Sequence, residues 1–198
     1  NQSPRAASPP ISGTVVPSVM QVEPEAPTPP PGFGVILVRI KSMSNRWGVG
    51  AGFLRRPAPA VDGSSGDEHF YSVAGAFRGW IFAKPEGNWF VLNVPAGRWQ
   101  LANSGFVSYC LGAPSFEVGA GEVVYAGTID LGGEDLGLDL DMAPARAWLK
   151  GPVPDRLRPA VYRNGATSSC NVFQTIYPLE VPGAPFESGY RGGSHQEP

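Results

Sequence analysis

Seven carboxylates lie close together in the middle of the chain and are the first candidates for chemistry. They are Glu117, Glu122, Asp130, Glu134, Asp135, Asp139 and Asp141. Three of them, Asp130, Glu134 and Asp135, surround a Gly-Gly loop, and clustered hard oxygen ligands of this kind can hold Ca²⁺. The spacing is not that of an EF-hand, and the alternation over 138–141 is typical of a half-exposed strand. We therefore expect no metal site and keep calcium at Asp130, Glu134 and Asp135 as the alternative.

The patterns that enzymes use for nucleophilic or acid–base catalysis are missing. The sequence has no Gly-x-Ser-x-Gly pentapeptide, and the glycines of 48–52 do not have the spacing of a dinucleotide fingerprint. The histidines are His69, beside a polar loop, and His195, in the C-terminal tail. We predict a non-catalytic protein without a cofactor. An enzyme with paired carboxylates is the alternative.

Cys110 and Cys170 are the only two cysteines, and they lie far apart in segments that read as structured. This favours one disulfide over a zinc site, because neither cysteine has a second ligand at short spacing. Two buried free thiols are the alternative. Disulfides persist outside the reducing cytosol, so we expect an exported protein of the periplasm or the cell surface. We also expect a cleaved export signal before Asn1, and a lipid anchor upstream of Asn1 that attaches the protein to the outer membrane.

Five tryptophans, Trp47, Trp80, Trp89, Trp99 and Trp148, are candidates for ligand contact. In a β-rich fold most should lie in the core or in cross-strand pairs. A row of exposed rings would instead form a binding platform for sugars or for a protein partner. Trp80, Trp89 and Trp99 are the candidates for that platform.

The chain divides into an arm, one domain and a tail. Residues 1–32 hold nine of the 22 prolines and almost no large apolar side chains, which predicts an extended, proline-rich tether. Residues 33–178 should form the domain, and 179–198 a polar tail rich in glycine and proline. No apolar run approaches the about 18 residues that span a bilayer, so we expect no transmembrane segment.

Short strands separated by turns dominate the domain. We expect strands at 34–41, 69–84, 89–94, 98–101, 106–110, 115–118, 122–131, 136–140, 160–163 and 171–177. The segments 89–94 and 98–101 should pair as a hairpin around Pro95-Ala-Gly97, and turns should lie at 119–121 and at Asn164-Gly165. One short helix is expected at 142–150, with Asp141 as its cap and Pro144 in its first turn, and a second helical turn is possible near 154–157. This pattern predicts a mostly β protein, a sandwich or a barrel.

The stretch Trp89-Phe-Val-Leu-Asn-Val-Pro-Ala-Gly-Arg-Trp-Gln-Leu101 resembles a strand–turn–strand unit of bacterial envelope β-domains. Prealbumin-like carboxypeptidase regulatory domains and PEGA-type modules carry this unit, and 116–129 looks like their next two strands. The chain also resembles uncharacterised envelope lipoproteins of Gram-negative bacteria with a late helix and an Asn-Gly…Cys segment, here Asn164-Gly165 to Cys170. The resemblance covers 88–131 well and 141–170 loosely. It implies an immunoglobulin-like or prealbumin-like β-sandwich without catalytic residues.

Composition limits the partners. The formal charge is −2 and only 16% of the residues are charged, so the chain lacks the clustered Lys and Arg that neutralise nucleic acid. We expect an exported accessory protein whose β-domain contacts another envelope protein or a second copy of itself. The alternative is a module that binds carbohydrate or cell wall through exposed aromatic rings.

Overall fold

The structure is a computed structural model, and it describes residues 28–42, 51–55, 70–72, 88–104, 107–130, 137–149, 155–168, 170, 173 and 175–190. Several predictions concern residues outside these ranges. They include most of the arm, the loop at 58–68, most of the strand region at 69–84, and the side chains Trp47, His69, Trp80, Glu134, Asp135 and His195.

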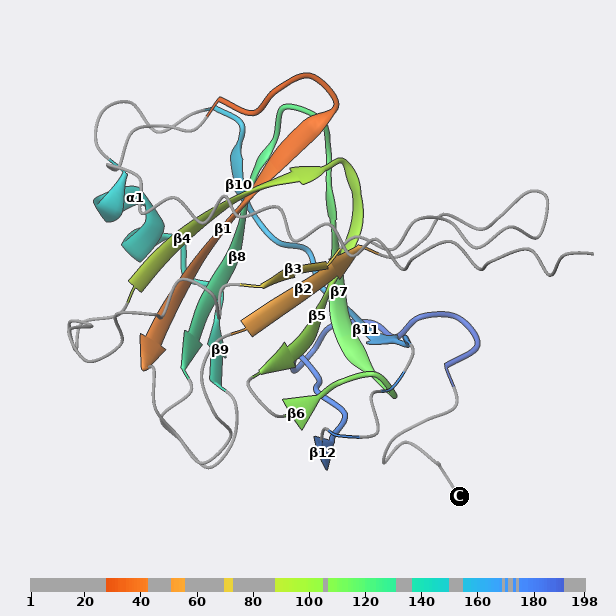
Figure 1. Cartoon of the computed structure of the whole chain (residues 1–198). Helices are drawn as coiled ribbons and strands as arrows, with labels where there is room; N and C mark the ends of the chain where they lie inside the picture. The colour runs from red at the N-terminus through yellow and green to blue at the C-terminus, as the bar shows by residue number, and fades with distance from the viewer. Residues whose placement is uncertain are drawn as a thin grey trace, which may run out of the picture.

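Two β-sheets packed face to face form the domain, which confirms the predicted mostly β sandwich (Figure 1). The five-stranded sheet has the order β10-β8-β1-β4, with β9 beside β8. Its strands are β1 (Phe33–Ser42), β4 (Asn88–Pro95), β8 (Val123–Asp130), β9 (Gly137–Asp139) and β10 (Leu157–Pro159). The seven-stranded sheet has the order β11-β7-β5-β2-β3, with β6 on β5 and β12 on β6. Its strands are β2 (Ala51–Arg55), β3 (Phe70–Ser72), β5 (Gly97–Ser104), β6 (Val107–Ser108), β7 (Ala113–Val118), β11 (Arg163–Ala166) and β12 (Thr175–Ile176).

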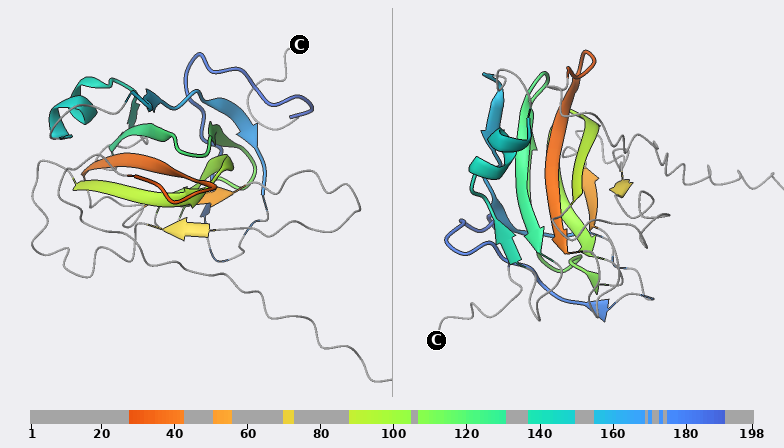
Figure 2. Two further views of the ribbon diagram at one scale, coloured as in Figure 1. Left: turned by 90° about the horizontal axis from the view of Figure 1, so that it is seen from above. Right: turned by 90° about the vertical axis from the view of Figure 1, so that its left-hand side faces the viewer.

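Strand β1 shows why its sequence is a continuous apolar run. Ile36, Val38 and Ile40 face the other sheet and join the main core. Val35 and Leu37 point to the opposite face, where they join a second apolar cluster under helix α1 (Ala143–Trp148). Both faces of the strand are therefore buried, and Figure 2 shows α1 on the outer side of the five-stranded sheet.

The short helix near the C-terminus is confirmed, but it is shorter than the predicted 142–150. Met142 occupies the N-cap position and makes no capping bond with its side chain. The predicted cap, Asp141, lies one residue earlier, where its Oδ1 accepts a hydrogen bond from the Ala143 N–H at 3.0 Å. Pro144 sits in the first turn as expected. Asp141 therefore caps a backbone N–H of the first turn although it lies just outside the helix.

The predicted hairpin around Pro95-Ala-Gly97 is wrong, because β4 and β5 belong to different sheets. β4 pairs with β1, whereas β5 pairs with β2, β6 and β7. Gly97, with φ 149°, redirects the chain from one sheet to the other in a conformation that favours glycine. Leu92 of β4 and Trp99 of β5 then both belong to the main core. The predicted turn at 119–121 is confirmed, and the Glu122 N–H closes it by donating a hydrogen bond to the Gly119 carbonyl at 3.1 Å. This turn also connects the two sheets, because it lies between β7 and β8.

The predictions for 160–165 also need correction. Within the expected strand 160–163, residues 160–162 are instead a crossing segment between β10 and β11, and Arg163 is the first residue of β11. Asn164-Gly165 is not a turn but lies inside β11, where the register shifts and Gly165 has φ +85°. The Tyr190 ring occupies the space that a Cβ at Gly165 would need. A close approach, not a reversal of direction, therefore requires this glycine.

Residues 179–190 pack onto the sandwich, so the described domain continues beyond the predicted boundary at 178. Asn164 holds this segment, which we call the C-terminal strap. Its side chain accepts a hydrogen bond from the Val181 N–H at 2.8 Å and donates to the Val181 carbonyl at 3.0 Å. Its backbone bonds to Pro185 and Glu187, each at 2.8 Å. The buried asparagine thereby fastens the segment through hydrogen bonds, beside the apolar contacts that Leu179, Val181 and Ala184 make with the main core.

Candidate binding surfaces

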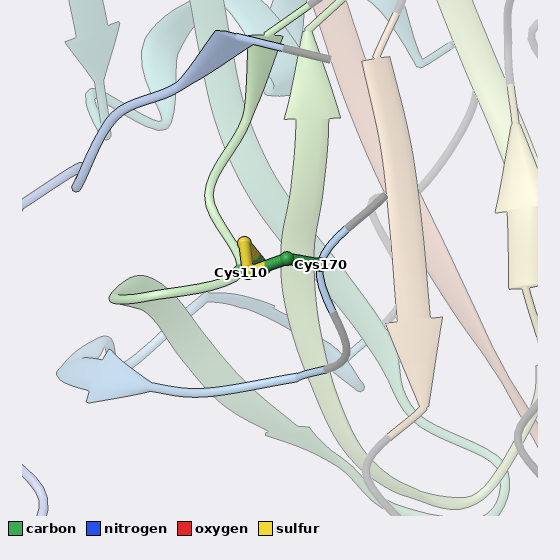
Figure 3. Close-up of a disulfide and its surroundings, with 2 residues drawn as sticks. All are labelled: Cys110 and Cys170. Atoms are coloured by element: carbon green, nitrogen blue, oxygen red, sulfur yellow. A yellow bond between two sulfur atoms is a disulfide. The ribbon is translucent and has the colours of Figure 1, made fainter. Parts of the chain in front are cut away.

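The predicted disulfide between Cys110 and Cys170 is confirmed, with a Cα–Cα distance of 5.2 Å (Figure 3). It joins two segments that also share backbone hydrogen bonds. β12 pairs with β6, the Tyr177 N–H donates to the Ser108 carbonyl at 3.0 Å, and the Leu179 N–H donates to the Gly112 carbonyl at 2.9 Å. The described residues of 107–112 and 170–179 therefore form one cross-linked end of the sandwich, which we call the disulfide end.

Exposed apolar side chains gather at this disulfide end. The described chain has five large hydrophobic side chains with high exposure: Leu111 (56%), Val161 (76%), Phe173 (89%), Ile176 (37%) and Tyr177 (47%). All except Val161 lie within seven residues of a disulfide cysteine. In Figures 1 and 2, β6 and β12 lie at the end opposite the loop that leads into β1. An apolar surface therefore faces away from the point where the proline-rich arm joins the domain.

The structure does not bring the predicted tryptophan platform together. Trp99 is completely buried in the main core, where its Nε1 donates to the Pro95 carbonyl at 3.0 Å. Burial follows from the crossing at Gly97, which turns Trp99 toward the opposite sheet. Trp80 lies outside the described residues. Trp99 therefore cannot contribute to an exposed surface.

Trp89 lies on the outer face of the five-stranded sheet, apart from Trp99. Its ring stacks on Trp148 of α1, with centroids 4.9 Å apart and planes 13° apart. The Arg39 guanidinium lies 5.6 Å from the Trp89 ring centroid, and the buried Tyr125 ring lies at 5.9 Å. Sugar binding usually needs an open ring face, so this arrangement fits helix docking better than a sugar platform.

The acidic residues are distributed over turns and ion pairs. Asp130 faces Lys41, with 3.8 Å between Oδ2 and Nζ. Asp139 accepts the Asp141 N–H at 2.9 Å. Glu134 and Asp135, the other proposed calcium ligands, lie outside the described residues. Within the described ranges, no three His, Cys, Asp or Glu side chains come close enough together to hold a metal ion.

A groove of about 440 Å³ lies along the flank of the sandwich where β7, β10 and β11 come together. Its floor is aromatic, because Phe116 and Tyr162 are almost fully buried and stack edge to face at 5.1 Å. Burial raises the pKa of Tyr162, and its hydroxyl donates to the Ala126 carbonyl at 2.6 Å. The remaining lining consists of Arg98, Glu117, Arg158, Val161, Arg163 and Pro185. Sequence reasoning missed this groove because its arginines come from three separate strands.

Two of the arginines are held by carboxylates. Arg98 contacts Glu187 of the C-terminal strap at 2.6 Å and Glu117 at 3.3 Å, and it donates to the Ser115 hydroxyl through Nε and Nη2. Arg158 donates through Nη2 to Glu122 Oε2 at 2.6 Å. This hydrogen bond lowers the pKa of Glu122, against the opposing effect of burial. The third arginine, Arg163, has no ion-pair partner in the described part of the chain.

Gln100 is the neighbour of Ser115 across β5 and β7, and it is completely buried. Neither its amide oxygen nor its amide nitrogen has a hydrogen-bond partner in the described structure. Such an unsatisfied amide weakens the fold unless another group reaches it.

Comparisons with protein-family models, with curated proteins and with solved structures find no match to this chain. The resemblance to envelope β-domains therefore remains a prediction from the residues of 88–131. Among the described residues, no helix is long and apolar enough to cross a lipid bilayer.

Proposed function

We propose that this protein is an exported, non-catalytic accessory protein of the bacterial envelope whose β-sandwich binds a protein at the disulfide end. The partner is another envelope protein or a second copy of the chain. The observation that carries the proposal is the concentration of exposed apolar side chains there: Leu111, Phe173, Ile176 and Tyr177. A concentration of exposed apolar side chains is typical of protein contact sites.

The position of the surface supports the same function. The arm joins the domain through residues 28–32, where the Phe33 N–H bonds to Pro30 and the Ala96 N–H bonds to Gly32, each at 3.0 Å. The disulfide end is the far end of the sandwich. A domain tethered through its arm would therefore present the apolar surface outward.

The disulfide supports both the location and the surface. A cross-link between segments 60 residues apart is typical of oxidising compartments, which favours the periplasm or the cell surface. It also fixes the short strand β12, which has two residues and pairs, among the described strands, with β6 alone. Oxidation outside the cytosol would then complete the binding surface.

The test is chemical crosslinking in the cells that make the protein, followed by isolation of the full chain. Phe173→Asp and Ile176→Asp place charge on the surface, and Ala147→Asp places the same charge on the exposed side of α1 as the control. We expect one protein neighbour, or a crosslinked pair of copies, that the control retains and the two variants lose.

Two results would contradict the proposal. One is an unchanged set of neighbours in the Phe173→Asp and Ile176→Asp variants. The other is binding to isolated peptidoglycan without any specific protein neighbour, which would favour the carbohydrate alternative. The stacked pair Trp89 and Trp148 would then be the first residues to examine.

A further inference from the structure

The groove on the flank of the sandwich lies away from the disulfide end and shares no residue with the apolar surface there. It lies where each sheet ends, because β10 is an edge strand of one sheet and β11 is an edge strand of the other. The crossing segment 160–162 connects these strands along the groove. Its volume of about 440 Å³ is within the range of ligand pockets.

The lining combines positive charge with an apolar floor. Arg98, Arg158 and Arg163 face a single lining carboxylate, Glu117. Arg98 is fully engaged, because all three of its guanidinium nitrogens bond to Ser115, Glu117 or Glu187. The available donors therefore belong to the other two arginines.

Arg158 and Arg163 keep donors for a ligand. Among the described residues, the side-chain bonds of Arg158 both use Nη2, one to Glu122 and one to the Glu117 carbonyl, and none uses its Nε or Nη1. The Arg163 side chain is exposed, and the described part of the chain supplies no ion pair to it. A planar guanidinium matches a carboxylate in geometry and charge.

The C-terminal strap shows which kind of segment this flank already holds. Phe186 forms a parallel bridge with Asn164 of β11, and the following Glu187 places its carboxylate on Arg98 and Ser115. An extended segment with an apolar residue beside an acidic one is thus bound in the same chain, at the side of the groove where Pro185 forms part of the wall.

We propose that the groove binds an extended, acidic segment of a protein, with a carboxylate on Arg158 and Arg163 and an adjacent apolar side chain against Val161 and the Phe116–Tyr162 floor. The exposed Val161 then becomes covered. Glu117 on the wall disfavours a densely charged ligand such as a phosphate-rich polymer. This site does not depend on the contact proposed for the disulfide end.

Fluorescence anisotropy with the full-length chain tests the proposal. The probe is a fluorescein-labelled octapeptide of alternating valine and glutamate, and its counterpart has glutamine in place of glutamate. We expect saturable binding below about 1 mM and about tenfold weaker binding of the glutamine peptide. Arg163→Gln should also weaken binding about tenfold, because it removes an exposed charge without breaking an ion pair. Arg146→Gln, on the exposed side of α1, should leave binding unchanged.

Val161→Asp provides a second variant. The new carboxylate should repel the glutamates of the peptide and abolish its binding, whereas Val161→Thr should retain most of the affinity. Equal affinity for the two peptides, or full affinity in Arg163→Gln, would overturn the proposal. Absence of peptide binding together with binding to vesicles rich in phosphatidylglycerol would overturn it as well, because the site would then recognise a lipid headgroup.

Discussion

Removal of the Cys110–Cys170 disulfide is expected to destabilise the domain severely. The bond closes a loop with a sequence separation of 60 residues. In the chain-entropy model, a loop of that length restricts the unfolded chain enough to stabilise the folded state by about 4 kcal/mol. A single domain has a net stability of about 5–15 kcal/mol, so the loss would be a large share of the total.

The measurement is urea unfolding of the wild-type protein and of the Cys110→Ala/Cys170→Ala variant, followed by circular dichroism. Wild-type protein treated with dithiothreitol is the matched control, because it loses the bond without a change of sequence. Both should unfold at lower urea concentration than the oxidised protein, with similar losses of free energy. The variant should lose slightly more, since alanine leaves a small void at the buried Cys110.

A loss below about 1 kcal/mol in both samples would contradict this prediction, since it would mean that the cross-link barely restricts the unfolded chain. Insensitivity of the wild-type protein to dithiothreitol, together with two titratable thiols in the native state, would show that the bond does not form.

Three further predictions concern single residues. Gln100→Met should raise the free energy of unfolding by about 1–2 kcal/mol, because it removes a buried amide without partners, and thermal unfolding would show it. Gly34→Ala should destabilise by about 1–3 kcal/mol, because the new Cβ would collide with Val118 and a backbone carbonyl, whereas Gly137→Ala on the exposed strand β9 should change little. Glu122 has a lowered pKa in the folded state, so its contribution is present above the unfolded pKa and is lost as the pH falls through the folded pKa. Glu122→Gln should therefore cost less than about 1 kcal/mol near neutral pH and nothing in strong acid, as urea unfolding across pH would measure.

The sequence predicted the features that depend on local pattern or on counting. The apolar run of β1, the turn at 119–121, the short helix after Asp141 and the disulfide all follow from such signals. The prediction of each feature depends only on residues that are neighbours in the sequence or, for the disulfide, on the absence of further metal ligands near the two cysteines.

Features that depend on which surfaces meet were not predictable. A strand, a Pro-Ala-Gly bend and another strand have the same local pattern whether the strands pair or face each other across a core. Trp99 is buried because the second arrangement occurs. The C-terminal strap was also missed, because the hydrogen bonds that fasten it run to Asn164, 17 residues before Val181, and such a bond leaves no local sequence pattern.

Site-specific photocrosslinking tests the proposed protein contact at the disulfide end most directly. Benzoylphenylalanine replaces Phe173, whose side chain is 89% exposed, in the cells that make the protein. We predict one discrete adduct, with another envelope protein or with a second copy, that is absent when the same group replaces Ala147. No adduct from position 173, or the same adducts from both positions, would contradict the proposed function.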